Sequence, residues 1–316
     1  MTEPQGRSAP LRDVVMPAGA DWLVPDWPAP PGVFALCTTR TGGVSLPPYD
    51  SLNLGTHVGD DLTAVMANRK VLESALQAHT PGARAVFLNQ VHGDGVALLD
   101  GHPPNGTEAD ACMAMAPGAV CTIMVADCLP VLFAHASGQA VAAAHAGWRG
   151  LAGSGGQGVL ESVLKNFCAQ APVPSAPSAI KLEASASPNE VSGAQPYVQA
   201  DGDPCGIAEG MLAWLGPCIG PQNFEVGAEV YAAFCNADAA AQACFVARVG
   251  VPGKFLCDLA GLARLRLQAL GITRIYGNNS TPAWCTVTNT SRFFSHRRDS
   301  ASLGSSGRFA ACIWRG

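Results

Sequence analysis

The sequence is poor in charged residues, which make up 14% of its 316 positions, and it contains no run of Lys or Arg. Its formal net charge is -5 at pH 7. A mildly acidic chain lacks the basic surface with which proteins bind the phosphates of nucleic acids. We therefore expect no nucleic-acid partner.

The sequence shows no pattern typical of a secretory signal or of a membrane span, and we expect neither. Its first residues, MTEPQGRSAPLRDVV, have no basic segment followed by an apolar one. Asp, His, Gly or Pro interrupts the longest apolar runs well before they reach the length of a transmembrane helix. The apolar fraction of 48% is enough for a sizeable core, so we expect a cytoplasmic protein without a membrane partner.

None of the 12 cysteines belongs to a CxxC pair. This absence argues against a zinc ribbon and against a thioredoxin-like dithiol. The chain is also too long for its cysteines to form a disulfide-dense scaffold. Most of them have apolar neighbours, as in VCTIM and AACIW, and we expect these to be buried as small apolar side chains.

The hydrophobic pattern mixes strands and helices without a regular β-α-β repeat, which predicts an α+β fold with a mixed sheet. One helix should begin at a cap on Asp60 or Asp61 and continue to about Ala78. Its apolar positions are expected on one face, namely Leu62, Val65, Met66, Leu72 and Leu76. Other helices are expected in GVLESVLKNF, GAEVYAAFC and DLAGLARLRLQAL, and strands at residues 34–39, 85–93, 120–127 and 211–216, near RFFSH and in RFAACIW.

Two segments fall outside this pattern. Residues 1–32 are Pro-rich and irregular, and we expect a surface lead-in there, followed by one catalytic domain over residues 33–316. More than half of residues 171–200 are Ala, Pro or Ser without periodicity. This composition predicts a disordered insertion at about 169–209, which separates two core segments without marking a domain boundary.

Residues 125–150, VADCLPVLFAHASGQAVAAAHAGWRG, contain one cysteine and two histidines in apolar surroundings. A hairpin that turns at the central Ser-Gly would set Pro130 opposite His145. Cys128 and His145 would then lie at the same edge of the sheet, while His135 would lie beside the turn. Because chemistry often occurs where a strand leaves the core, this hairpin predicts a site at Cys128 and His145 and leaves His135 out of it.

His92, in NQVHGDG, also follows a strand and enters a loop with flanking glycines. Two His and one Cys suit zinc with an open fourth position, at which the ion can activate water. Two alternatives stay open. Each histidine can be a hydrogen-bonded core residue, and Cys128 with His145 can be a thiolate nucleophile with its general base.

Arg149 follows His145 closely and precedes GLAGSGGQG and a predicted helix. Backbone N–H groups at a helix start, together with an arginine, can hold a phosphate. The segment is no Walker A loop, because GK[ST] does not follow its glycines, and a flexible connector is the alternative. Arg40 in TTRTGG and Arg69 in NRK are further cationic candidates.

Several long motifs in a fixed order closely resemble the YfiH family, also called the laccase-domain, polyphenol oxidoreductase or peptidoglycan editing factor family. They are TTRTGGVSLPPYDSLNLG, NQVHG, ADCLPVLF, AAAHAGWRG, LGPCIGPQNFEVGAEV and FFSHRRD…GR…IW. The likeness covers about residues 33–167 and 211–314. It implies a single compact α/β sandwich of mixed sheets and a zinc site made by His92, Cys128 and His145.

The resemblance implies a zinc-dependent purine nucleoside phosphorylase for adenosine, inosine and methylthioadenosine, with adenosine deaminase activity. It also implies two alternatives, a hydrolase that removes a misincorporated L-serine from a peptidoglycan precursor and a copper-dependent polyphenol oxidoreductase. Under the first hypothesis the site comprises the catalytic and metal-ligating His92, Cys128 and His145, with Arg149, Arg40, Arg69, Asn53 and Asp127 as candidates to bind phosphate or substrate.

The sequence lacks two motifs that are typical of known zinc deaminases and of multicopper oxidases. The zinc-deaminase signature, HxE with PCxxC, is absent, so deamination would need another arrangement of groups. The seven histidines include no HxH pair, which fits a multicopper centre poorly. One copper ion in place of zinc stays open, because copper outcompetes zinc in many such sites. A non-catalytic metal-binding module, with a closed fourth ligand, is the remaining alternative.

Overall fold

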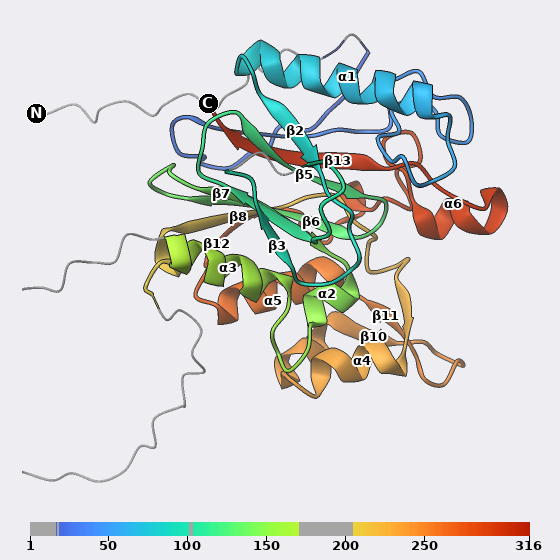
Figure 1. Ribbon diagram of the computed structural model, residues 1–316. Coiled ribbons are helices and arrows are strands. Elements are labelled where there is room, and N and C mark those ends of the chain that lie inside the picture. Colours follow the sequence, from blue (N-terminus) through green and yellow to red (C-terminus); the bar gives the residue numbers. More distant parts are fainter. Residues whose placement is uncertain (1–16, 18, 101–103, 171–204) are drawn as a thin grey trace, which may run out of the picture.

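Two β-sheets lie face to face in the middle of the molecule, with helix α1 outside one sheet and several helices outside the other (Figure 1). The computed structural model describes residues 17, 19–100, 104–170 and 205–316. Strands and helices alternate irregularly along the chain, and both sheets belong to one compact unit. The predicted α+β sandwich of mixed sheets is therefore confirmed.

The first sheet has four strands in the order β1-β13-β5-β2. Strand β13 pairs antiparallel with both β1 and β5, while β2 pairs parallel with β5. The final strand thus lies in the middle of the sheet beside the first strand. The bounds are β1 Val33–Cys37, β2 Arg84–Phe87, β5 Ala119–Val125 and β13 Phe309–Arg315.

The second sheet has six strands in the order β12-β8-β6-β7-β4-β3. Its central pairs are antiparallel and its two outer pairs are parallel. The bounds are β3 Val96–Leu98, β4 Ala111–Ala114, β6 Leu129–His135, β7 Val141–Ala146, β8 Met211–Leu215 and β12 Arg274–Gly277.

The remaining elements cover the outer face and one end of the six-stranded sheet (Figure 1). The α-helices are α2 Trp148–Ala152, α3 Val159–Gln170, α4 Ala228–Cys235, α5 Leu259–Ala269 and α6 His296–Leu303. A small sheet contains β9 Glu225–Gly227, β10 Phe245–Ala247 and β11 Lys254–Cys257. Short 3-10 helices occupy Ala208–Gly210, Ala239–Cys244 and Pro282–Trp284.

Three apolar layers hold these elements together. One lies between the two sheets and includes Ile123 and Trp214. Another lies between the six-stranded sheet and its helices and includes Phe133 and Phe167. The third lies between the four-stranded sheet and α1. Strand β5 faces two of these layers, which explains why AVCTIMV is apolar at almost every position rather than at every second one.

Helix α1 (Leu62–His79) is capped by Asp61, one of the two residues predicted for this role, whose side chain accepts a hydrogen bond from the N–H of Ala64 at 2.9 Å. The expected apolar face is wrong at two positions, because Leu62 and Met66 are 60% and 53% exposed. The buried stripe instead contains Asn68. Its amide group bonds to backbone and hydroxyl groups of the segment 44–53, so a polar side chain is satisfied in that stripe.

We expect Asp61→Ala to lower the free energy of unfolding by about 1 kcal/mol, because the first turn of α1 loses the acceptor for one of its free N–H groups. Urea denaturation followed by circular dichroism measures this loss. Asp61→Asn keeps an accepting side-chain oxygen and should lose clearly less. Equal losses in the two variants would contradict the capping role.

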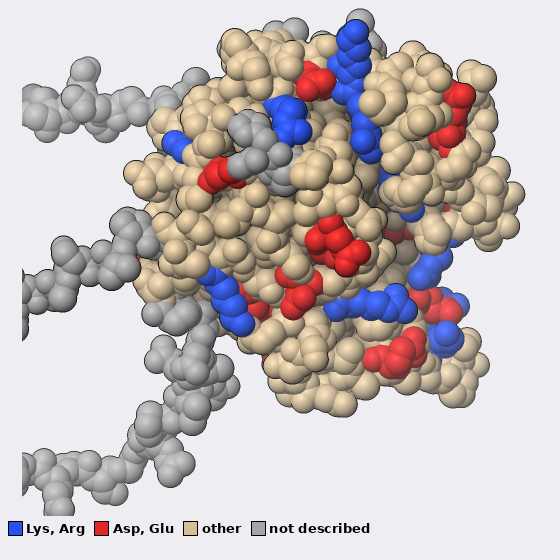
Figure 2. All heavy atoms as spheres, in the orientation of Figure 1, with Lys and Arg blue, Asp and Glu red and all other residues tan. Residues whose placement is uncertain are grey.

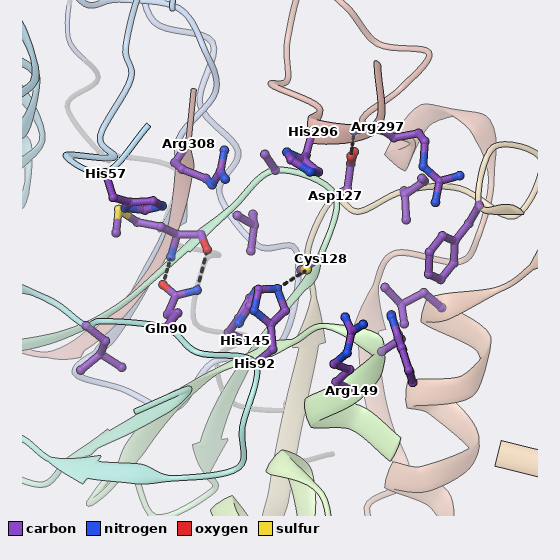
Figure 3. Close-up of a pocket in the computed structure, with 18 of the residues that line it drawn as sticks. His57, Gln90, His92, Asp127, Cys128, His145, Arg149, His296, Arg297 and Arg308 are labelled. Carbon is purple, nitrogen blue, oxygen red and sulfur yellow. Dashed lines mark hydrogen bonds between the residues drawn. The ribbon is translucent and has the colours of Figure 1, made fainter. Parts of the chain in front are cut away.

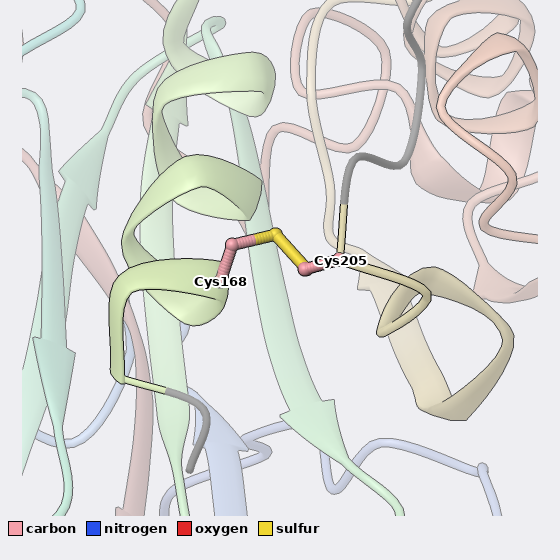
Figure 4. Close-up of a disulfide and its surroundings, with 2 residues drawn as sticks. All are labelled: Cys168 and Cys205. Atoms are coloured by element: carbon pink, nitrogen blue, oxygen red, sulfur yellow. A yellow bond between two sulfur atoms is a disulfide. The ribbon is translucent and has the colours of Figure 1, made fainter. Parts of the chain in front are cut away.

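Two sequence expectations need correction. The segment RFFSH forms no strand: Phe293 and Phe294 are fully buried in an irregular stretch that follows a turn, and Ser295 caps α6. Buried aromatic residues at consecutive positions imitate the pattern of a strand. Seven of the ten free cysteines are buried, as expected for most of them, but Cys168 and Cys205 form a disulfide (Figure 4). A sequence separation of 37 residues gave no sign of this pair.

The two irregular segments are described only in part. The predicted insertion lies mostly outside the described residues. The disulfide joins Cys168, in the last turn of α3, to Cys205, which is the first described residue after 171–204. Of the predicted lead-in, Trp22 is buried and Leu23 pairs with Cys37 of β1. Residues 19–32 therefore pack against the domain.

The surface shown in Figure 2 is mostly uncharged, and its Lys and Arg side chains are interspersed with Asp and Glu. None of the helices in the described part of the chain combines the length and the apolarity that a bilayer span requires.

Candidate metal centre

The hairpin β6–β7 places two of the predicted residues together. Leu129 pairs with Ala146 and Pro130 with His145, which is the register expected from the sequence. Cys128 directly precedes β6 and so lies at the same sheet edge as His145. His135 ends β6 at the opposite end, where its Nδ1 contacts the hydroxyl of Ser137 at 2.8 Å.

His92 reaches this edge from the loop that follows β2, with its backbone in the left-handed region at a φ of 64°. Its Nε2 lies 3.7 Å from the Sγ of Cys128 (Figure 3). The rings of His92 and His145 meet edge to face, with their centroids 4.8 Å apart. One donor atom from each of the three residues lies within 4.8 Å of the others, so His92, Cys128 and His145 form one cluster.

Asp110 is fully buried and forms hydrogen bonds to both His92 and His145. Its carboxylate accepts the backbone N–H groups of His92 at 2.9 Å and of Gly93 at 2.6 Å. It also bonds to Nδ1 of His145 at 2.8 Å. Burial raises the pKa of Asp110, but the hydrogen bonds from His145 and the loop outweigh this effect and lower it. The ionised carboxylate therefore orients the His145 ring and leaves its Nε2 for the cluster.

The electrostatics of the cluster favour a thiolate. Burial alone would raise the pKa of the Cys128 thiol, but charge and hydrogen bonds from His145 and His92 lower it to about 6. Burial likewise acts to lower the pKa of His145, while Cys128 and Asp110 raise it to about 9. Each partner stabilises the charged form of the other, so the pair is prepared either to bind a cation or to act as nucleophile and base.

The donor set fits a metal ion. A tetrahedral zinc site, with bonds of about 2.3 Å to sulfur and about 2.0 Å to nitrogen, separates these two donors by about 3.5 Å, close to the distance observed. Gly147 leaves room for the donors, because a Cβ there would lie 2.8 Å from Cδ2 of His92 and 3.1 Å from Sγ of Cys128. Three protein donors would leave the fourth position of a zinc ion to another ligand, as in catalytic rather than structural zinc sites.

The cluster opens into a cavity of about 390 Å³. Trp148, Phe224, Ile219 and Leu259 give part of its wall an apolar character. Five further lining residues carry basic side chains, which are His57, Arg149, His296, Arg297 and Arg308 (Figure 3). A cavity of this size with an apolar wall and a few convergent polar groups suits a small, partly anionic molecule.

Of the candidates for binding phosphate or substrate, Arg149 and Asp127 line the cavity. Arg149 lies over the ring of Trp148, 4.5 Å from its centroid. Asp127 accepts the hydroxyl of Thr286 at 2.5 Å and the backbone N–H of Arg297 at 2.6 Å. Its carboxylate thereby joins the strand end before Cys128 to the start of α6.

The structure does not bring the other three candidates into this cavity. Arg40 binds Asp50 and the carbonyl of Thr290. Asn53 is fully buried and bonds to Gly55, Asp60 and the backbone of Arg308. Arg69 donates to the carbonyl of Leu54 and lies over the ring of Phe87. The side chains of all three are therefore engaged in contacts within the fold, away from the lining of this cavity.

Sequence reasoning missed Asp110, His57 and the residues near the C-terminus that line the cavity. A partial signal existed for His296, Arg297 and Arg308, which belong to the motif FFSHRRD…GR…IW. No motif marked His57 and Asp110 as members of a site.

The fold and the site together define a class of protein, which is a two-sheet α/β domain with a His-Cys-His cluster, of donors suited to a metal ion, in a cavity with basic side chains. The chain belongs to the family described as multi-copper polyphenol oxidoreductase laccase, whose model matches residues 34–187 and 198–316. This confirms the resemblance to the YfiH family. Among the described residues, the cluster at Cys128 is the one group of three or more His, Cys, Asp or Glu that can hold a metal ion.

Similar proteins cover nearly the whole chain. It is 43% identical to a purine nucleoside phosphorylase of Pseudomonas aeruginosa, over 93% of this chain and 98% of that one. It is 44% identical to purine nucleoside phosphorylase YfiH of Escherichia coli, over 92% and 98%. A crystal structure of a Neisseria meningitidis protein superposes with a TM-score of 0.72 at 38% identity, covering 93% of this chain and 99% of that one. Relatives named as phosphorylases support an enzyme with a small-molecule substrate.

Proposed function

We propose that this protein is a zinc-dependent purine nucleoside phosphorylase acting on adenosine, inosine and methylthioadenosine, with adenosine deaminase as an accompanying activity. The observation that carries the proposal is the His92, Cys128 and His145 cluster, which opens into a cavity with apolar and basic walls. The names of the relatives at 43% and 44% identity support the same activity.

Phosphorolysis joins an oxygen of phosphate to C1′ of the ribose while the bond from C1′ to N9 of the purine breaks. The bonding electrons stay with N9, which takes up a proton as the base departs. Trp148 and Phe224 offer aromatic surface for the purine, and the basic residues of the cavity offer charge for the phosphate. The same walls serve each of the three nucleosides, because all contain a purine and a ribose.

A metal ion held by His92, Cys128 and His145 would supply Lewis acidity and an activated water. Deamination needs such a water at the purine ring, while phosphorolysis needs phosphate, so the two reactions have different co-substrates. Zinc is proposed because two imidazoles and one thiolate suit it and because deamination and phosphorolysis need no redox chemistry.

The test uses the full chain with its metal content quantified, and adenosine is supplied with and without phosphate. We expect about one zinc per chain. Adenine and ribose 1-phosphate should form only when phosphate is present, and inosine should form in both samples. Stoichiometric copper with phenol oxidation would contradict the proposal, as would negligible turnover of adenosine beside fast release of L-serine from a peptidoglycan precursor.

A further inference from the structure

We propose that Arg308 and His57 form the subsite for the phosphate co-substrate, on the opposite side of the cluster from Arg149 and Trp148. This inference rests on the proposed phosphorolysis. It assigns the phosphate to residues other than Arg149, the one arginine among the candidates from the sequence that reaches the cavity.

The guanidinium of Arg308 forms hydrogen bonds to the protein through one nitrogen, Nη1. Its Nη1 donates to the carbonyls of Ser306 and Gly307 at 2.7 and 3.1 Å. Its Nε and Nη2 make no hydrogen bond to the described residues, and the side chain lines the cavity. Gly55 packs against its Cγ, since a Cβ there would lie 2.9 Å from that atom. The side chain is thus held in place with two donor groups left for a ligand.

His57 lies beside Arg308 in the cavity wall and makes no hydrogen bond within the described part of the chain (Figure 3). Partial burial lowers the pKa of His57, and the positive charges of Arg308 and Arg69 lower it further. Asp127 is the one acidic side chain among the described residues that line the cavity, and its oxygens accept hydrogen bonds from Thr286, Ser295 and the backbone N–H of Arg297. The negative charges of Asp127 and Cys128 act on Arg308, but neither group forms an ion pair with it. The lowered pKa leaves His57 neutral near pH 7, so an imidazole N–H can donate to an anion with several oxygens that the charged guanidinium of Arg308 attracts.

The opposite wall of the cavity has a different character. The guanidinium of Arg149 lies 4.5 Å from the ring centroid of Trp148, and that of Arg297 lies 5.7 Å from the centroid of Phe224. Cys128 and His145 lie between this wall and the side of His57 and Arg308 (Figure 3). Arginine stacked on an aromatic ring presents a flat surface, which suits a purine better than a phosphate.

The arrangement matches the geometry of the reaction. In a displacement at C1′, the incoming phosphate oxygen and the departing purine lie on opposite faces of the ribose. Subsites for phosphate and base should therefore lie on opposite sides of the position that the ribose occupies. With the purine against Trp148 and Phe224, the ribose lies over the cluster and its far face is turned toward Arg308 and His57.

The experiment measures binding and kinetics separately on the zinc-loaded protein. Calorimetric titration with inorganic phosphate should show binding that weakens about 10- to 100-fold in His57→Gln and in Arg308→Gln, because charge-assisted contacts are lost. Arg308→Lys should recover part of the affinity. In phosphorolysis, the KM for phosphate should rise in the two glutamine variants, while the KM for adenosine stays within about twofold. Arg149→Gln should show the reverse pattern.

The matched controls are Arg248→Gln, an exposed arginine paired with Glu225, and His135→Gln at the far end of the hairpin. Both should bind phosphate like the wild type. Unchanged phosphate affinity in His57→Gln and Arg308→Gln would overturn the subsite whatever the activity. Binding of ribose 5-phosphate through Arg308, without binding of inorganic phosphate, would overturn it as well. If phosphate binding depends on Arg308 but no nucleoside is cleaved, the subsite stands and the proposed phosphorylase fails.

Discussion

Cys128→Ala and His145→Ala are each expected to abolish stoichiometric zinc binding and to bring turnover of adenosine to background. Each variant removes one of three donors that lie within 4.8 Å of one another, and two donors hold a catalytic zinc ion poorly. Cys128→Ala also removes the negative charge that stabilises the protonated form of His145. Metal analysis by mass spectrometry and product analysis by chromatography measure the two losses.

The control is His135→Ala, whose imidazole lies beside the turn at the other end of the same hairpin. It should keep wild-type zinc content and turnover. Unchanged turnover in both ligand variants would refute the site. Circular dichroism after chelation separates an enzyme from a structural metal module, because an open catalytic site should lose activity and mostly keep its fold, whereas a closed structural site should unfold.

Asp110→Asn is expected to weaken zinc affinity by about 10- to 100-fold, because Asp110 orients His145 through its Nδ1 and His92 through its backbone N–H, although it is not one of the three donors. Asp110→Ala should also lower the free energy of unfolding by about 3 kcal/mol or more, since buried N–H groups lose their acceptor. Competition with a fluorescent chelator measures the affinity, and urea denaturation of the metal-free protein measures the stability.

Asp100→Asn is the matched control. Its carboxylate also accepts two backbone N–H groups, those of Met115 and Ala116, but it does not line the cavity. A loss of stability without a change in zinc affinity is expected there. If Asp110→Asn likewise leaves the affinity unchanged, then Asp110 supports the loop only and does not position His145.

Local signals in the sequence were enough to predict several structural elements. The Ser-Gly turn fixed the register of β6 and β7, because a short hairpin connection leaves little freedom in the pairing. The pair Asp60 and Asp61 marked the start of α1 through the chemistry of a cap, and the structure assigns the cap to Asp61. The same local reasoning failed at Phe293 and Phe294, where burial of two neighbouring aromatic rings imitates a strand.

By itself, the sequence determined the fold class and predicted that His92, Cys128 and His145 lie together in one cluster. Cys128 and His145 belong to one hairpin, so their proximity follows from local pairing, and His92 was added by a motif. Only the tertiary structure decided what surrounds them. It placed Asp110 in contact with His145 and brought His57 and Arg308 into the cavity wall. It also kept Arg40, Asn53 and Arg69 out of the cavity. All of this depends on packing between elements far apart in the chain. Such packing is set by the shapes of three apolar layers, and no local pattern of residues encodes it.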